Sequence, residues 1–301
     1  MKYLFAIGVE KCGTTSLDSA LRQSKHFNCP KKKEAGFFAR HFDKGADFHQ
    51  RLYRRPFMGF DGYIVDFTPS YFRKPNVLVR LAELDSEKKF IICLRCPFRR
   101  AWSHYVHDLR IHYSLGDRSD YFRKQINVSF SGFFKDRKQY YFTKYSRLVE
   151  NVFETFGKKN CHVVIFEDLI DDWPQVSGKL DAFLGFESPV VRALQLPHAN
   201  QAQKVPYIYD HITHRNGEIT AVQKRRGRDF KLKKLSGQQL ENALAIQDSY
   251  ELELSEELSG EICDWFGEDV RSLEEMLARD LDKWLLPRAM KVNFDMMDDV
   301  N

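Results

Sequence analysis

The stretch YLFAIGVEKCGTTSL, residues 3–17, combines a lysine, two glycines and three hydroxyl side chains in a short segment. Gly8 and Gly13 allow the backbone to turn sharply and to expose its N–H groups. A helix that begins after Gly13 adds a positive partial charge at its first turn. Lys11 supplies a full charge, and Thr14 to Ser16 supply hydroxyl donors. The segment therefore predicts a loop that binds a phosphate.

A second segment, KFIICLRCPFRRAWSHY at residues 89–105, has the same strand-to-helix character. Phe90 to Leu94 form an apolar strand pattern, and Pro97 suits the first turn of a helix. Arg95 and Ser103 are eight residues apart. If the strand ends at Arg95, both side chains can converge on one phosphate at the carboxyl edge of the strand, so we predict a second phosphate site there.

The elements that must position these residues alternate between strand and helix signals. We predict strands at 3–9, 63–66, 90–94 and 162–169, with helices up to Leu21 and over 77–84. This alternation predicts an α/β fold with a central parallel sheet and with ligands at the carboxyl edge of its strands. A length of 301 residues, without internal repeats or a low-complexity linker, predicts one domain over residues 1–301.

The net charge of the chain and the spacing of its cysteines and histidines indicate which ligands it could bind. The formal net charge of +5 is mild and spread along the chain, which favours anionic small ligands over nucleic acid. Cys93 and Cys96 form a lone C-x-x-C that begins inside a predicted strand, and the two H-x-x-H pairs have no acidic or cysteine partner at ligand spacing. We therefore expect a reducing compartment and no metal site.

The first segment resembles the 5′-phosphosulfate loop of sulfotransferases that use 3′-phosphoadenosine 5′-phosphosulfate (PAPS), with the pattern strand, G-x-x-K-x-G-T-T/S, helix. The lysine precedes the second glycine, unlike the lysine of an ordinary P-loop. The second segment resembles the 3′-phosphate motif of the same family, L-R-x-P-x-x-R-x-x-S-x-Y. The resemblance implies the P-loop-like sulfotransferase fold and PAPS as co-substrate.

The resemblance also implies roles for single residues. Lys11 would bind the 5′-phosphate and the bridging oxygen, and Cys12, Gly13, Thr14, Thr15 and Ser16 would line the same phosphate. Arg95 and Ser103 would bind the 3′-phosphate. In the basic run at residues 223–234, Arg226, Gly227 and Arg228 resemble a loop that closes over the 3′-phosphate, although a solvated basic run is an equally good interpretation.

The segment KKKEAGFFARHFDKG, residues 31–45, resembles the E-x-x-F-F pattern of heparan-type sulfotransferases, in which the glutamate is the general base. Glu34 is therefore the predicted base, although Gly36 stands where those enzymes often have histidine or glutamine. The segment IVDFTPSYF, residues 64–72, resembles V-E-K-T/S-P-x-Y-F, with Phe67 in place of a catalytic lysine. Asp66 is the competitor of Glu34 as base, and it equally suits orienting the acceptor or capping the turn before Pro69.

The resemblance implies transfer of a sulfuryl group from PAPS to a hydroxyl, with an amine as second choice, on a carbohydrate, lipid or other small acceptor. Two alternatives stay open: a nucleoside-triphosphate-dependent kinase in which Asp66 helps to hold Mg²⁺, and a non-catalytic nucleotide-binding protein. No apolar run is long enough to cross a bilayer, and the first strand leaves no room for a signal peptide. We therefore expect a cytoplasmic protein, unlike the anchored Golgi members of the family.

Overall fold

The computed structural model describes residues 1–115, 130–141, 144–197, 211–215, 218–225, 228–234 and 256–285. Its contacts divide the chain into two compact units. The first unit comprises Met1–Cys96, Lys144–Asn200 and Glu275–Ala278, and the second comprises Pro97–Thr143, Gln201–Glu274 and Arg279–Asn301. Because the chain passes between these units several times, they are not consecutive domains, and a single domain over residues 1–301 stays a prediction.

A five-stranded parallel sheet forms the centre of the first unit, in the order β2-β3-β1-β4-β5. The strands are β1 (Lys2–Gly8), β2 (Phe27–Asn28), β3 (Tyr63–Phe67), β4 (Glu87–Leu94) and β5 (Cys161–Ile165). β1 is buried at every position after Lys2, because strands inside a parallel sheet are covered on both faces and read as continuous apolar runs. The predicted α/β fold with a central parallel sheet is confirmed.

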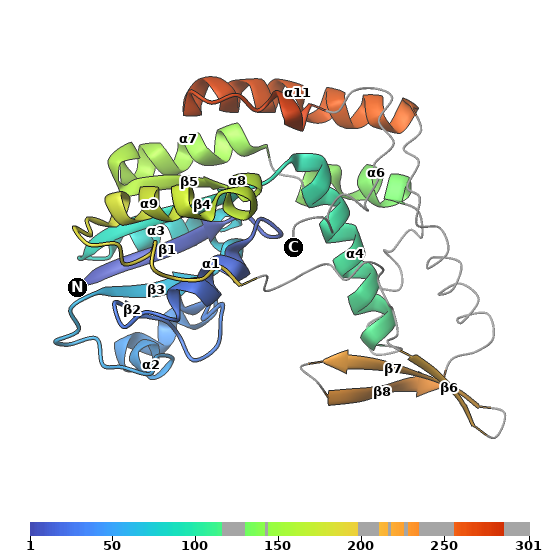
Figure 1. Ribbon diagram of the computed structural model, residues 1–301, viewed down its shortest axis with the longest axis horizontal. Helices are drawn as coiled ribbons and strands as arrows, with labels where there is room; N and C mark the ends of the chain where they lie inside the picture. Colours follow the sequence, from blue (N-terminus) through green and yellow to red (C-terminus); the bar gives the residue numbers. More distant parts are fainter. Residues whose placement is uncertain are drawn as a thin grey trace. The chain divides into compact units, whose positions relative to one another are not determined.

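Helices cover both faces of this sheet (Figure 1). The helices of the first unit are α1 (Thr14–Leu21), α2 (Gly45–Arg51), α3 (Pro75–Glu83), α7 (Tyr145–Phe156), α8 (Phe166–Asp171) and α9 (Trp173–Leu184). Phe156 of α7 stacks on Phe90 of β4 with ring centroids 3.9 Å apart, and the Tyr63 hydroxyl of β3 donates to the carbonyl of Leu184 at the end of α9. These contacts fix the helices on the sheet and leave its carboxyl edge to the loops.

The second unit contains α4 (Pro97–Leu115), α6 (Phe130–Tyr141) and most of α11 (Glu256–Leu277). It also contains an antiparallel sheet of three strands, β6 (His211–Arg215), β7 (Glu218–Arg225) and β8 (Arg228–Lys234). Among the described residues, no helix combines the length and the apolar character needed to span a membrane.

One predicted element is wrong in its extent. The strand expected over 162–169 ends at Ile165, and Phe166–Asp171 forms α8 instead. The acidic pair Glu167 and Asp168 explains the change, because carboxylates are favourable in the first turn of a helix. The other predicted strands and helices of the sheet are present, with ends that differ by a few residues.

Candidate active site

The predicted phosphate loop lies between β1 and α1, at the carboxyl edge of the sheet. β1 ends at Gly8, and α1 begins at Thr14 after Gly13, which has a φ of 83°. The first helical hydrogen bond runs from the Leu17 N–H to the Gly13 carbonyl at 3.1 Å. The N–H groups of a first helical turn point away from the helix, which is the arrangement that binds phosphates.

Gly13 is required at its position for two reasons. Its positive φ disfavours any residue with a Cβ. A Cβ at this position would also lie 2.7 Å from a ring carbon of Phe166 and 2.8 Å from a methyl carbon of Leu169. The loop is therefore packed directly against α8, and its shape depends on that contact.

Lys11 and Glu34 share an unusual backbone conformation. Within the described ranges, three non-glycine residues have positive φ values, namely Lys11 at 67°, Glu34 at 61° and Ala278 at 49°. Such conformations cost free energy, and they gather where function requires a particular side-chain direction. Two of the three are the residues predicted to be catalytic, and their catalytic roles stay predictions.

The remaining loop residues contribute in different ways. The Cys12 side chain is fully buried and its thiol donates to the Glu10 carbonyl at 3.5 Å, so Cys12 offers the site only its backbone. Thr14 and Ser16 are largely buried, whereas Thr15 is partly exposed. An ion pair between Glu10 and Arg73 ties the loop to the turn that follows β3.

Arg95 follows β4 directly and reaches the phosphate loop. Its guanidinium lies 4.3 Å from the ring centroid of Phe166, and its Nη1 is 3.4 Å from the Lys11 carbonyl. The Arg95 carbonyl accepts a hydrogen bond from the Tyr145 hydroxyl at 3.0 Å, which holds the backbone at this point. The structure thus places the Arg95 guanidinium against the backbone of the loop that carries Lys11.

The other predicted nucleotide contacts belong to the second unit or lie outside the described residues. Ser103 lies on α4 in the second unit and is partly exposed. Arg226 and Gly227 lie outside the described residues, and Arg228 is the first residue of β8. Their roles toward a 3′-phosphate stay predictions.

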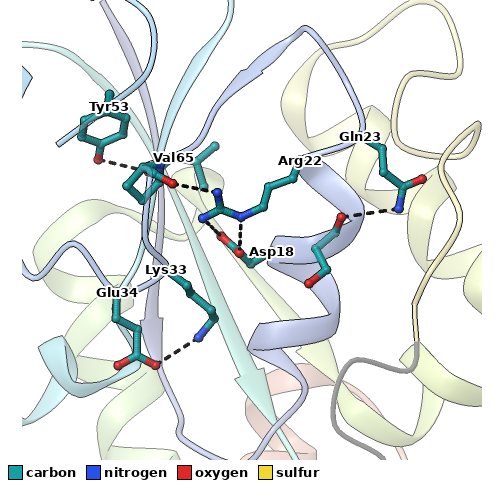
Figure 2. Close-up of polar contacts among 9 residues, drawn as sticks. Asp18, Arg22, Gln23, Lys33, Glu34, Tyr53 and Val65 are labelled. Carbon is teal, nitrogen blue, oxygen red and sulfur yellow. Dashed lines mark hydrogen bonds and ion pairs between the residues drawn. The ribbon is translucent and has the colours of Figure 1, made fainter. Parts of the chain in front are cut away.

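The segment that carries Glu34 lies close to the same edge of the sheet. Glu34 has 49% of its side chain exposed, and its Oε1 is 3.0 Å from the Lys33 ammonium (Figure 2). The burial of Cys93, near the end of β4, raises the pKa of its thiol, and the nearby charge of Lys33 opposes this effect.

Arg40 supports Glu34 from the next helical turn, residues Phe37–His41. Its guanidinium Nη2 donates to the Glu34 carbonyl at 3.0 Å. A Cβ at Gly36 would lie 2.3 Å from the same nitrogen, and Gly36 has a φ of 62°. The guanidinium of Arg40 thus occupies the space beside Gly36.

Asp66 is fully buried at the end of β3. Its two carboxylate oxygens accept hydrogen bonds from the Thr68 hydroxyl at 2.6 Å and from the Tyr71 hydroxyl at 2.7 Å. Burial raises the pKa of Asp66 to about 6, although both hydrogen bonds and the nearby charge of Arg40 favour its ionised form. A carboxylate enclosed in this way cannot reach an acceptor and is poorly placed to hold Mg²⁺, which weakens the kinase alternative.

Sequence reasoning missed the parts of the site that act through backbone contacts. Arg40 and the Glu10–Arg73 ion pair carried no recognised pattern, because their partners lie in distant segments or in the main chain. Thr68 could have been found, since a hydroxyl two residues after an aspartate is a common turn contact. Tyr71 stands in the segment that resembles V-E-K-T/S-P-x-Y-F, but nothing in that pattern indicates that its buried hydroxyl donates to Asp66.

One group of carboxylates in the described part of the chain has the spacing of a cation site. Oxygen atoms of Glu274, Asp280 and Asp282, in the second unit, lie within 4.8 Å of one another. These side chains are partly or fully exposed, and acidic groups of this kind are common without an ion. We assign the group no role.

Comparisons with known proteins agree with this geometry. The chain matches the sulfotransferase domain family over residues 2–228. It is 35% identical over 104 residues to heparan sulfate glucosamine 3-O-sulfotransferase 3B1 of Homo sapiens, a match that covers 34% of this chain and 26% of the human protein. It is 30% identical over 100 residues to the membrane-associated sulfotransferase kil1 of Dictyostelium discoideum, covering 33% and 21% of the two chains. The matches thus span about a quarter of the length of these relatives.

A solved sulfotransferase from Alicyclobacillus acidocaldarius has a similar fold, with a TM-score of 0.56 and 23% identity. The superposition covers 94% of this chain and 98% of the bacterial one. This likeness confirms the P-loop-like sulfotransferase fold that the motifs predicted. Because the family match extends over most of the 301 residues, the chain belongs to the sulfotransferase family.

Proposed function

We propose that this protein transfers a sulfuryl group from PAPS to a hydroxyl of a glycan, with Glu34 as the general base. The observation that carries the proposal is the meeting of three segments at one edge of the sheet. The phosphate loop, the Glu34 segment and the turn after β3 are joined there by the Glu10–Arg73 ion pair and by the contacts of Thr68 and Tyr71 with the backbone after Glu34.

The residues at the phosphate loop fit the nucleotide part of PAPS. The first turn of α1 and the ammonium of Lys11 suit the 5′-phosphate, because both stabilise negative charge. In the transfer, the acceptor oxygen would bond to sulfur while the bond from sulfur to the bridging oxygen breaks. Glu34 would take the acceptor proton, and Lys11 would stabilise the charge that grows on the departing phosphate.

The surface next to Glu34 favours an acidic acceptor. Lys31 binds the carboxyl end of α2, through its N–H to the Leu52 carbonyl and its ammonium to the Arg51 carbonyl, each at 2.8 Å. This contact brings Arg51 to the run of exposed or partly exposed basic residues that directly precedes Glu34, namely Lys31, Lys32 and Lys33. Such a group attracts carboxylate and sulfate groups. The human relatives named for heparan sulfate, itself an acidic glycan, agree with this choice.

Calorimetry and an acceptor panel test the proposal. Adenosine 3′,5′-bisphosphate should bind without Mg²⁺, and more tightly than ATP does with or without Mg²⁺. With labelled PAPS, acidic glycans should accept the label better than neutral glycans, phenols or amines, and added salt should reduce the preference by screening the basic side chains. Mg²⁺-dependent binding of ATP with no transfer from PAPS would favour the kinase, and binding of nucleotide without transfer to any acceptor would favour the non-catalytic alternative.

A further inference from the structure

Two buried hydroxyl groups connect the Asp66 carboxylate to the backbone just after Glu34. The Thr68 Oγ1 donates to Asp66 Oδ1 and accepts from the Gly36 N–H at 3.2 Å. The Tyr71 hydroxyl donates to Asp66 Oδ2 and accepts from the Phe38 N–H at 3.2 Å. Each oxygen of one buried carboxylate therefore begins a chain of two hydrogen bonds that ends in the segment carrying Glu34.

The direction of these hydrogen bonds is set by Asp66. A hydroxyl group has a single hydrogen, so a hydroxyl that donates to the carboxylate must turn its lone pairs toward the backbone N–H. The distances of 2.6 and 2.7 Å from the hydroxyls to the carboxylate are short, as expected for a charged acceptor. The carboxylate thus orients both hydroxyls as acceptors for Gly36 and Phe38.

The two backbone contacts fix the turn on which Glu34 depends. The Gly36 carbonyl accepts from the Arg40 N–H at 2.9 Å, which begins the helical turn at Phe37–His41. Arg40 in that turn donates from its guanidinium to the Glu34 carbonyl. Because Glu34 has a φ of 61°, its backbone needs such support to stay in a sparsely populated conformation.

We propose that Asp66 is the positioning residue for Glu34, acting through the hydroxyl groups of Thr68 and Tyr71. Asp66 itself does not touch the acceptor, because its side chain is fully buried and both of its oxygens are engaged. This assignment rests on the proposed function, in which Glu34 is the base. In this assignment Asp66 acts neither as a second base nor as a metal ligand.

Deleting one hydroxyl at a time tests this inference. Thr68→Val and Tyr71→Phe should lower kcat by roughly tenfold to a hundredfold, because small displacements of a catalytic group have effects of that size. Binding of adenosine 3′,5′-bisphosphate, measured by calorimetry, should stay near that of the parent, since neither hydroxyl contacts the phosphate loop. Thr68→Ser keeps the hydroxyl and should retain turnover near the parent value.

Tyr53→Phe is a matched control for Tyr71→Phe. The Tyr53 hydroxyl is also buried and donates to the carbonyl of Val65, the residue before Asp66, at 3.1 Å (Figure 2). Its loss removes a hydrogen bond in the same part of the core without touching Gly36 or Phe38. Tyr53→Phe should therefore leave kcat unchanged, and an equal fall in both tyrosine variants would overturn the inference.

The double variants decide whether the hydroxyls act through Glu34. In a Glu34→Gln background, Thr68→Val and Tyr71→Phe should cause little further loss, since the group that they position is already inactive. If the loss of kcat in a double variant equals the product of the losses in the two single variants, the positioning role would be overturned while Glu34 would remain the base. Normal turnover of Glu34→Gln alone would overturn the base assignment and this inference together. If Tyr71→Phe does not fold, the Thr68 pair carries the whole test.

Discussion

At the scale of single residues, substitutions of Lys11 and of Arg95 should have different effects, although the Arg95 guanidinium contacts the Lys11 carbonyl. Lys11→Ala should lower transfer by roughly a hundredfold to a thousandfold, because Lys11 would stabilise the charge that grows during the reaction. Arg95→Ala should chiefly weaken binding of nucleotides with a 3′-phosphate, by roughly tenfold to a hundredfold for one charged hydrogen-bond donor. Calorimetry with adenosine 3′,5′-bisphosphate, together with turnover at saturating PAPS, separates the two effects.

A control for both cations is Lys2→Ala, at the exposed start of β1 and the opposite end of the strand from the loop. It should change neither quantity. If Arg95→Ala binds PAPS as tightly as the parent does, the assignment of the second phosphate motif is wrong.

Glu34→Gln keeps the size of the side chain but removes its ability to take a proton. Turnover at saturating PAPS should fall by roughly a hundredfold to ten-thousandfold, the usual contribution of a positioned base, while PAPS affinity changes little. Asp43→Asn is the control, because Asp43 is an exposed acid in the next turn of the same segment and should be neutral. Near-normal turnover in Glu34→Gln would show that another group is the base.

At the scale of elements, the contact between α1 and α8 depends on Gly13. Gly13→Ala should lower the free energy of unfolding by roughly 2–5 kcal/mol, the sum of a left-handed backbone cost and an overpacking cost. The same change should weaken nucleotide binding, because the loop must move away from Phe166 and Leu169. Chemical denaturation and calorimetry measure the two effects.

Gly185→Ala is the matched control for this change. Gly185 has a φ of 75° at the end of α9, and nothing lies within 4 Å of a Cβ placed there. It should show the backbone cost alone, about 1–2 kcal/mol. Equal losses in the two variants would show that the clash with α8 has no effect on stability.

The sequence was informative where a local pattern decides the structure, and less so where distant segments meet. Gly8, Lys11 and Gly13 predicted the loop because glycine conformations and strand-to-helix order are local properties. The predicted strand over 162–169 was too long, because Glu167 and Asp168 favour the first turn of α8 after the apolar residues of β5. The role of Asp66 could not be predicted from the residues next to it in the sequence. Its hydrogen bonds come from hydroxyls of the following turn, and these hydroxyls in turn contact backbone groups after Glu34.

At the scale of the whole molecule, buried ionisable groups predict how stability depends on pH. Burial lowers the pKa of His49 and of His162 from 6.5 to about 4. Between these values the unfolded chain binds more protons than the folded one, so the free energy of unfolding falls as the pH falls from about 6.5 to 4. Asp66, whose pKa rises from 3.8 to about 6, acts in the opposite sense over nearly the same range.

The combined effect of the two histidines should exceed that of Asp66, so the free energy of unfolding should be lower in acid than at neutral pH. His49 stacks on Phe37 with ring centroids 4.1 Å apart, so phenylalanine suits the same place. His49→Phe should reduce the pH dependence by up to roughly 3 kcal/mol, at about 1.4 kcal/mol per pKa unit. Urea denaturation at pH 7.5 and pH 4.5 measures this, and an unchanged difference between the two pH values would contradict the assignment.

The position of β1 in the sheet also governs how the chain folds. β1 pairs with β3 and β4, so that Tyr3 lies opposite Ile64 and Lys88, residues that are synthesised much later. At a synthesis rate of about 5–20 residues per second, this buried apolar strand spends on the order of ten seconds without its partners. Pairings over such sequence separations also form slowly. The strand that carries the phosphate loop is therefore where a chaperone would be expected to bind the nascent chain, and where aggregation would begin if folding were delayed.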